Sequence, residues 1–123
     1  MKIIYHSLTG NIKRFLSKSK YNNQSFELLT GEEIIDEKFI LITYTIGNGE
    51  IPQIIEKFMR KNYCNCKGLI GSGNRNWGKN FCKSIYKLND IYDIPVLFVF
   101  ETSGTKKDII KFHEIIKEKV NEL

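Results

Sequence analysis

The chain has 123 residues, of which 41% are hydrophobic and 27% charged, and its formal net charge of +5 indicates an anionic ligand or an acidic partner. The composition excludes a disordered or collagen-like chain, and no apolar run approaches the roughly 18 residues that a membrane span needs. Because no signal peptide is visible either, we expect one cytoplasmic domain over residues 1–123 that binds no membrane.

Short apolar runs alternate along the chain with stretches of helical periodicity. The runs that we interpret as strands lie at residues 3–6, 26–29, 39–44, 68–71 and 94–100. Apolar residues recur at helical spacing within residues 12–16, 51–58, 77–88 and 109–120. Lysines at residues 111–119 alternate with glutamates, which favours a solvated helix face over a nucleic-acid-binding stripe, so we expect no nucleic-acid partner.

The alternation of strands and helices predicts an α/β fold with a doubly wound parallel sheet. The runs at 39–44 and 96–100 are apolar at consecutive positions, as in interior strands that helices cover on both faces. With five strands and right-handed crossovers, we expect the strand order 2-1-3-4-5. In that order ligands bind where the carboxyl ends of the first and third strands meet.

Small and polar residues gather after three of the predicted strands. They form the loops Ser7-Leu8-Thr9-Gly10-Asn11, Thr45-Ile46-Gly47-Asn48-Gly49 and Ser72-Gly73-Asn74-Arg75-Asn76-Trp77-Gly78. Because the carboxyl ends of parallel strands meet at one edge of a sheet, we expect the three loops to surround one site.

The first loop has the chemistry of an anion site. Gly10 permits a tight turn, and a helix that begins near Asn11 directs free backbone N–H groups toward a ligand. Ser7 and Thr9 add hydroxyl donors. The loop matches neither the Walker A pattern nor the dinucleotide-binding G-x-G-x-x-G pattern. The alternative is that Ser7 or Thr9 only caps the helix.

The second loop contains Gly47 and Gly49 on either side of Asn48, and glycine readily adopts positive φ. This combination permits a peptide group to turn over. A hairpin turn centred on Asn48 and Gly49 is the alternative, but it fits poorly because a helix follows this strand.

The third loop places Trp77 between Gly73 and Gly78. An indole face beside exposed backbone donors suits a planar heteroaromatic ring, which stacks on its face and forms hydrogen bonds at its rim. The alternative is that Trp77 belongs to the core, because it also starts the helical series that continues at Phe81. Together the loops predict a site for a phosphate joined to a planar ring, which is the shape of flavin mononucleotide (FMN).

The three cysteines, Cys64, Cys66 and Cys82, form an odd set without C-x-x-C spacing. This pattern favours neither a disulfide framework nor a zinc site, so we expect reduced thiols. No cluster of carboxylates or histidines has metal-ligand spacing, and we interpret His6 and His113 as structural residues.

Three motifs give the chain a specific resemblance. They are S-L-T-G-N at residues 7–11, G-S-G-N-R-N-W-G at residues 71–78 and F-E-T-S-G-T at residues 100–105. With these motifs the chain resembles the NrdI family, the flavodoxin-like FMN proteins that serve class Ib ribonucleotide reductase. The resemblance implies a flavodoxin-like fold with FMN as cofactor. Glu101 and the turn at Gly104 and Thr105 match the family pattern but have no obvious role in flavin binding. We expect Thr105 to cap the last helix.

The resemblance also implies the residues that contact the cofactor. Around the phosphate and at the first loop they are Ser7, Leu8, Thr9, Gly10, Asn11 and Ile12. Around the ring they are Thr45, Ile46, Gly47, Asn48, Gly49, Ser72, Gly73, Asn74, Trp77 and Gly78, with Phe81 and Cys82 lining the same pocket.

The resemblance further implies a function. Reduced FMN reacts with dioxygen, and the superoxide produced passes to the dimanganese site of the class Ib ribonucleotide reductase small subunit, where it supports formation of the tyrosyl radical. The metal then belongs to the partner, and a separate electron donor reduces the flavin. Two alternatives remain open: a short flavodoxin that acts as a general electron carrier, and a phosphate-binding or nucleic-acid-binding module without flavin.

Overall fold

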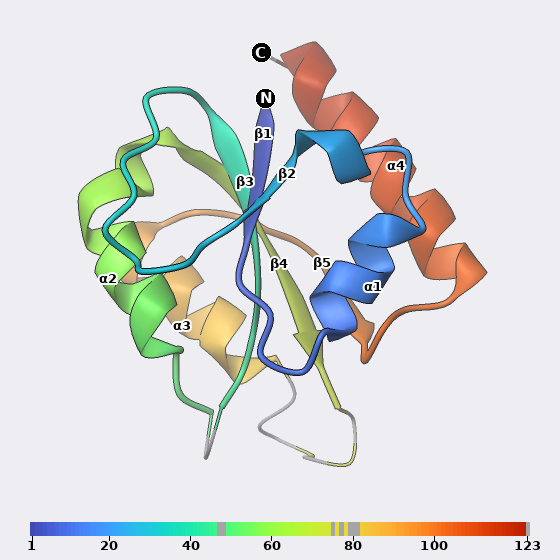
Figure 1. The fold of residues 1–123 in the computed structure, drawn as a ribbon, viewed down its shortest axis with the longest axis horizontal. Helices are drawn as coiled ribbons and strands as arrows, with labels where there is room; N and C mark the ends of the chain where they lie inside the picture. Colours follow the sequence, from blue (N-terminus) through green and yellow to red (C-terminus); the bar gives the residue numbers. More distant parts are fainter. Residues whose placement is uncertain (47–48, 75, 77, 79–81, 123) are drawn as a thin grey trace.

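The computed structural model describes residues 1–46, 49–74, 76, 78 and 82–122 of the chain. In this part of the chain five parallel strands form one sheet in the order β2-β1-β3-β4-β5 (Figure 1). The strands are β1 (Lys2–Tyr5), β2 (Ser25–Glu27), β3 (Phe39–Tyr44), β4 (Cys66–Gly73) and β5 (Val96–Glu101). The predicted strand order is therefore confirmed.

Four α-helices connect or follow the strands within the described residues. They are α1 (Asn11–Ser17), α2 (Gln53–Asn62), α3 (Lys83–Tyr92) and α4 (Lys106–Glu122), and short 3₁₀ turns cover Asn22–Gln24 and Tyr63–Asn65. Helices α1 and α4 cover one face of the sheet, while α2 and α3 cover the other (Figure 1). None of the described helices has both the length and the apolar character required to cross a membrane.

Alternate residues of the central strands enter two separate cores. On the face of α1 and α4, Ile40 and Ile42 of β3 pack with Phe15 and Phe112. On the face of α2 and α3, Phe39 and Leu41 of the same strand pack with residues such as Phe58. Because helices cover both faces of this strand, neither face is exposed to solvent, and residues 39–43 are all buried.

Strand β5 lies at one edge of the sheet, with β2 at the other, although the apolar run of β5 suggested an interior strand. Its first four residues, 96–99, are only partly buried. Helices cover both faces of this strand, so an apolar sequence is compatible with the edge position. A run of consecutive apolar residues therefore indicates that helices cover both faces of a strand, but it does not indicate whether the strand is central or at an edge of the sheet.

Helix α4 begins as the sequence predicted. The Thr105 hydroxyl accepts a hydrogen bond from the Asp108 N–H at 3.2 Å, and the Asp108 carboxylate accepts one from the Thr105 N–H at 2.8 Å. This reciprocal pair satisfies two backbone donors at the helix start. At the other end, Val120 is 49% exposed, so it ends the predicted apolar series on the surface.

The loop between β5 and α4 rests on an aromatic cluster. The Phe15 ring stacks on Phe100 with centroids 4.0 Å apart and meets Phe112 edge to face at 5.1 Å. Gly104 lies above this cluster with φ +73°, and a Cβ placed there would lie 2.6 Å from Cδ1 of Phe15. Glycine thus allows the loop to approach a ring that its neighbours hold in place.

We expect Gly104→Ala to destabilise the fold more than Gly78→Ala. Both glycines have positive φ, but a Cβ at Gly78 has no described atom within 4 Å, so the two variants share the backbone cost and differ in the clash with Phe15. The difference in unfolding free energy should be about 1 to 3 kcal/mol, as for overpacked cores. Urea unfolding of both variants measures it, and equal losses would contradict the close contact.

Candidate functional site

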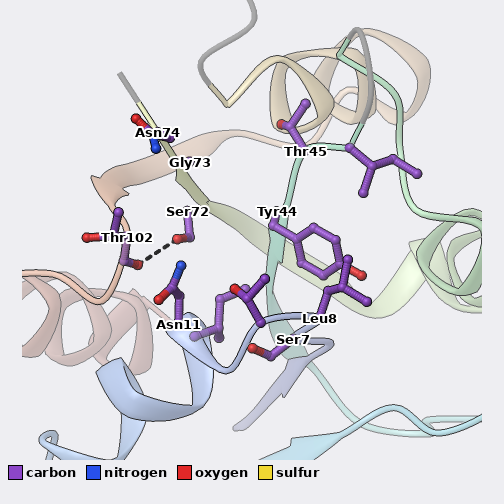
Figure 2. Close-up of a pocket in the computed structure, with 12 residues that line it drawn as sticks. Ser7, Leu8, Asn11, Tyr44, Thr45, Ser72, Gly73, Asn74 and Thr102 are labelled. Atoms are coloured by element: carbon purple, nitrogen blue, oxygen red, sulfur yellow. Dashed lines mark hydrogen bonds between the residues drawn. The ribbon is translucent and has the colours of Figure 1, made fainter. Parts of the chain in front are cut away.

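A cavity of about 460 Å³ opens at the carboxyl edge of the sheet (Figure 2). Residues that follow or end four different strands line it. They are Ser7, Leu8, Thr9, Asn11, Ile12, Tyr44, Thr45, Ile46, Ser72, Gly73, Asn74 and Thr102. The cavity is of the size that holds a cofactor-sized ligand.

The register of the sheet explains why these loops meet. Strand β1 pairs with β3, which pairs with β4 so that Tyr44 lies opposite Ser72, and β4 pairs with β5 so that Gly73 lies opposite Glu101. Strands β3, β4 and β5 therefore end at nearly the same level, and the chain leaves each of them beside the next. The crossovers from β1 and β3 run to opposite faces of the sheet, so a crevice opens between these strands.

The structure brings most of the predicted site residues together. Among the cavity-lining residues, those predicted from sequence are Ser7, Leu8, Thr9, Asn11, Ile12, Thr45, Ile46, Ser72, Gly73 and Asn74. The predicted residues Gly10, Gly49, Gly78 and Cys82 are described but do not line it. The predicted residues Gly47, Asn48, Trp77 and Phe81 lie outside the described residues.

The first loop enters α1 without a side-chain cap. Gly10 occupies the N-cap position with φ +86°, and no side chain forms a capping hydrogen bond there. The alternative in which Ser7 or Thr9 caps this helix is therefore wrong. Both residues instead line the cavity.

The chain reverses direction between residues 46 and 50. The Ile46 N–H donates to the Glu50 carbonyl at 3.1 Å, and the Glu50 N–H donates to the Ile46 carbonyl at 2.8 Å, which makes an isolated antiparallel bridge. The alternative of a hairpin turn centred on Asn48 and Gly49 falls in part outside the described residues, because Asn48 is not among them. The chain forms this single bridge and then enters α2 at Gln53. Gly49 has φ +101° and lies against the stem of Lys83.

Thr45 uses its hydroxyl to bind the start of α3. Its Oγ1 accepts a hydrogen bond from the Ser84 N–H at 3.1 Å and donates one to Ser84 Oγ at 2.9 Å. Ser84 Oγ donates in turn to the Tyr44 carbonyl at 2.8 Å. Both side chains are buried, so this hydroxyl fixes the loop to α3 and is not free for a ligand.

Cys82 does not line the cavity, although the sequence predicted that it would. It is fully buried directly before α3, and a Cβ added to Gly71 of β4 would lie 3.4 Å from its Sγ. None of the three cysteines forms a disulfide in the structure, with Cys64 exposed and Cys66 buried. Burial raises the pKa of the Cys66 thiol to about 12.

Thr102 lines the cavity but was not predicted from sequence. It adopts φ +50°, a strained value for a β-branched residue. Its N–H donates to the Gly73 carbonyl at 2.8 Å, and its carbonyl accepts from Ser72 Oγ at 2.8 Å (Figure 2). The available signal was the position of Thr102 after a fifth parallel strand, whose carboxyl end must lie at the same edge as the other three.

Tyr44, the last residue of β3, is the second lining residue that sequence reasoning missed. Its half-buried ring lies 5.7 Å from the His6 ring, centroid to centroid, and burial raises the pKa of its hydroxyl. The phenol therefore stays neutral at physiological pH. Tyr44 also borders a second, more open hollow of about 630 Å³ that shares Leu8 and Ile46 with the cavity.

The described lining of the cavity contains no charged side chain. Hydroxyl, amide and backbone groups alternate there with the apolar side chains of Leu8, Ile12 and Ile46. Such a lining binds a ligand through hydrogen bonds and apolar contact. Arg14 lies behind the first loop, where it donates to the Thr9 carbonyl at 3.3 Å and to Asn11 Oδ1 at 2.6 Å.

The sequence profile of a family described as "NrdI Flavodoxin like" matches residues 3–114. The chain belongs to the NrdI flavodoxin-like family. One family member, Protein NrdI of Bacillus licheniformis, is 42% identical over 120 residues, which cover 98% of this chain and 90% of that protein.

Two solved flavodoxin structures share the fold of this NrdI-family chain. A short-chain flavodoxin associated with a PDU bacterial microcompartment has a TM-score of 0.68 at 16% identity, with 98% of this chain and 96% of that chain covered. The flavodoxin of Fusobacterium nucleatum, bound to FMN, has a TM-score of 0.61 at 20% identity, with 99% and 97% covered.

We expect Thr45→Val to destabilise the folded chain by about 1 to 3 kcal/mol, because it leaves the buried Ser84 N–H without an acceptor. Thr45→Ser keeps the hydroxyl and should restore most of the loss. Urea unfolding of the protein without added ligand measures both variants. Equal stabilities of the valine and serine variants would show that the hydrogen bonds to Ser84 contribute nothing.

We expect one thiol to react quickly with a thiol-specific reagent at pH 8 in the native state. Cys64 is exposed, whereas Cys66 and Cys82 are buried and the pKa of Cys66 is raised to about 12, so its reactive thiolate is scarce. Denaturant should expose all three thiols. Cys64→Ser provides the control, and rapid labelling of that variant in the native state would contradict the burial of the other two.

Proposed function

We propose that the chain binds FMN in the cavity at the carboxyl edge of the sheet and acts as an accessory redox protein of class Ib ribonucleotide reductase. In this proposal the reduced flavin reacts with dioxygen, and superoxide passes to the dimanganese site of the reductase small subunit, where it enables formation of the tyrosyl radical. The protein works in the cytoplasm, and a separate electron donor reduces its flavin. Membership of the NrdI flavodoxin-like family supports the assignment to the reductase.

The cavity supports FMN as the ligand. Its volume suits a cofactor, and its uncharged lining combines hydrogen-bonding groups for a phosphate and a ribityl chain with apolar walls for a ring. A likeness to a flavodoxin bound to FMN agrees with this choice. The observation that carries the proposal is the convergence of four strand ends on this one cavity in a member of the family.

The residues divide into two groups by position. We assign the phosphate to the loop that enters α1, with contacts from Ser7, Thr9, Gly10, Asn11 and Ile12. We assign the ring and its rim to the side of the cavity that Thr45, Ile46, Ser72, Gly73 and Asn74 line. The family resemblance adds contacts from Gly47, Asn48, Gly49, Trp77, Gly78, Phe81 and Cys82 to this assignment. Leu8 and Tyr44 line both the cavity and the neighbouring hollow, so they lie at the boundary between the two.

Bound FMN would supply electron transfer to dioxygen, which the side chains of the protein cannot perform. The chain contributes positive charge around the site. Arg14 lies behind the phosphate loop, and the stem of Lys83 lies against Gly49. A positive charge about 8 Å from a ligand that gains an electron is worth about 2 kcal/mol at an effective dielectric constant near 20. A positive charge at such a distance would favour added electrons in this cavity.

In this proposal the manganese ions belong to the partner. Among the described residues, no three His, Cys, Asp or Glu side chains gather into a group that holds a metal ion. His6 is held against Tyr44 and the Leu28 carbonyl, and His113 accepts a hydrogen bond from the Lys20 N–H at 3.1 Å. Both histidines thus have structural roles.

The deciding experiment combines the protein with FMN, reduces it without oxygen, and admits air in the presence of the manganese-loaded reductase small subunit. We expect a yellow protein, superoxide on aeration and a tyrosyl radical in the partner. Asn11→Asp, which replaces an amide donor by a carboxylate beside the phosphate, should lower FMN affinity at least about tenfold. Asn23→Asp carries the same charge change at an exposed distant position and should bind FMN like the wild type.

Two results would contradict the proposal in different ways. A protein that stays colourless with excess FMN would exclude a flavin role. A protein that binds FMN and transfers electrons, but supports no tyrosyl radical in the partner, would be a general electron carrier.

A further inference from the structure

The side chain of Asn11 is held from behind by two residues outside the cavity lining. Asn11 Oδ1 accepts a hydrogen bond from Arg14 Nη2 at 2.6 Å and another from Ser103 Oγ at 3.0 Å. Ser103 Oγ accepts in turn from Arg14 Nε at 3.2 Å. The guanidinium therefore reaches Asn11 both directly and through a hydroxyl that belongs to the loop before α4.

These contacts determine which way the amide of Asn11 points. Arg14 has only donors, so the amide atom that it contacts must be the oxygen. The amide nitrogen is then directed into the cavity, on the side of Ser72 and Thr102 (Figure 2). Because a cation polarises the carbonyl of the amide, the N–H groups at its other end become stronger donors.

The same guanidinium and a neighbouring lysine fix both loops on this side of the cavity. Arg14 Nη2 also donates to the Thr9 carbonyl at 3.3 Å. Lys18 Nζ donates to the Ser103 carbonyl at 2.9 Å and to the Gly104 carbonyl at 3.2 Å. Through these bonds α1 holds the loop after β5, and the loop after β5 helps to hold Asn11.

We propose that Arg14 and Ser103 are positioning residues that make the site selective for the phosphorylated flavin. They hold Asn11 with its amide donor toward the phosphate, so their contribution is absent when the flavin carries a free hydroxyl in place of phosphate. This inference rests on the proposed binding of FMN. It adds two residues that lie behind the cavity lining, one of them from the loop after β5.

The test compares the affinities of FMN and riboflavin, which differ only in the phosphate. Arg14→Lys keeps the positive charge, but one ammonium group cannot hold Asn11, Ser103 and the Thr9 carbonyl in the planar geometry of a guanidinium. We expect FMN affinity to fall about tenfold, as for one charge-assisted hydrogen bond, while riboflavin affinity changes less than about twofold. Arg60→Lys, an exposed arginine on α2, is the matched control.

A second variant separates positioning from charge. Ser103→Ala leaves every charge in place and removes one donor to Asn11, so we expect a smaller loss, about threefold, again for FMN alone. In an Asn11→Ala background, Arg14→Lys should cause a much smaller loss than in the wild type, because the main effect passes through that amide and only the bond to the Thr9 carbonyl remains. If Arg14→Lys does not fold, Ser103→Ala decides the question alone.

The outcomes distinguish this inference from the proposed function. If the wild type binds neither flavin, both are overturned. If it binds FMN and Arg14→Lys retains full affinity, or if FMN and riboflavin affinities fall together, the proposed function stands and the positioning role is overturned. Additive losses of Arg14→Lys and Asn11→Ala would also overturn it, since the arginine would then affect FMN binding by a route that does not pass through Asn11.

Discussion

The structure depends on the burial of its central strands on both faces. Residues of β1 and β3 alternate between two apolar cores, so neither strand has a side that can face water. Such strands are parallel and need helical crossovers, and the crossovers lie on both faces. The carboxyl ends of the strands then meet at one edge, where the chain must change direction several times. The site is a consequence of this arrangement, because loops of different origin face one another there without any segment reaching across the molecule.

Hydrogen bonds from side chains to backbone groups give that edge its shape. Ser84 holds the end of β3, Ser72 holds the loop after β5, and Arg14 holds the loop after β1. Each of these bonds joins segments that are close in space and most of them are distant in sequence. The positively charged Arg14 side chain lies behind the loop after β1, while the described lining of the cavity itself contains no charged side chain.

The sequence predicted the features that depend on local pattern. The strand order, the two helical layers, the cap at Thr105 and the clustering of the loops after β1, β3 and β4 all followed from periodicity and from residues such as Gly10 and Asn11. The misses depend on contacts between distant segments. Thr102 enters the site through its bonds to β4, and the hydroxyl of Thr45 is occupied by Ser84, which no spacing along the chain reveals. The bridge between residues 46 and 50 was missed because we expected the chain to pass from β3 to a helix without turning back, and a helix that follows does not prevent a single antiparallel bridge.

Thr102 illustrates what the edge gains from an unfavourable backbone angle. A glycine at this position would adopt φ +50° without strain, but it would also give the unfolded chain more conformations to lose. A β-branched residue has few alternatives once its two bonds to β4 have formed, so the wall that it contributes is stiff. The strained angle at Thr102 lowers the stability of the fold. In return, a loop that is already ordered loses less conformational entropy when a ligand binds.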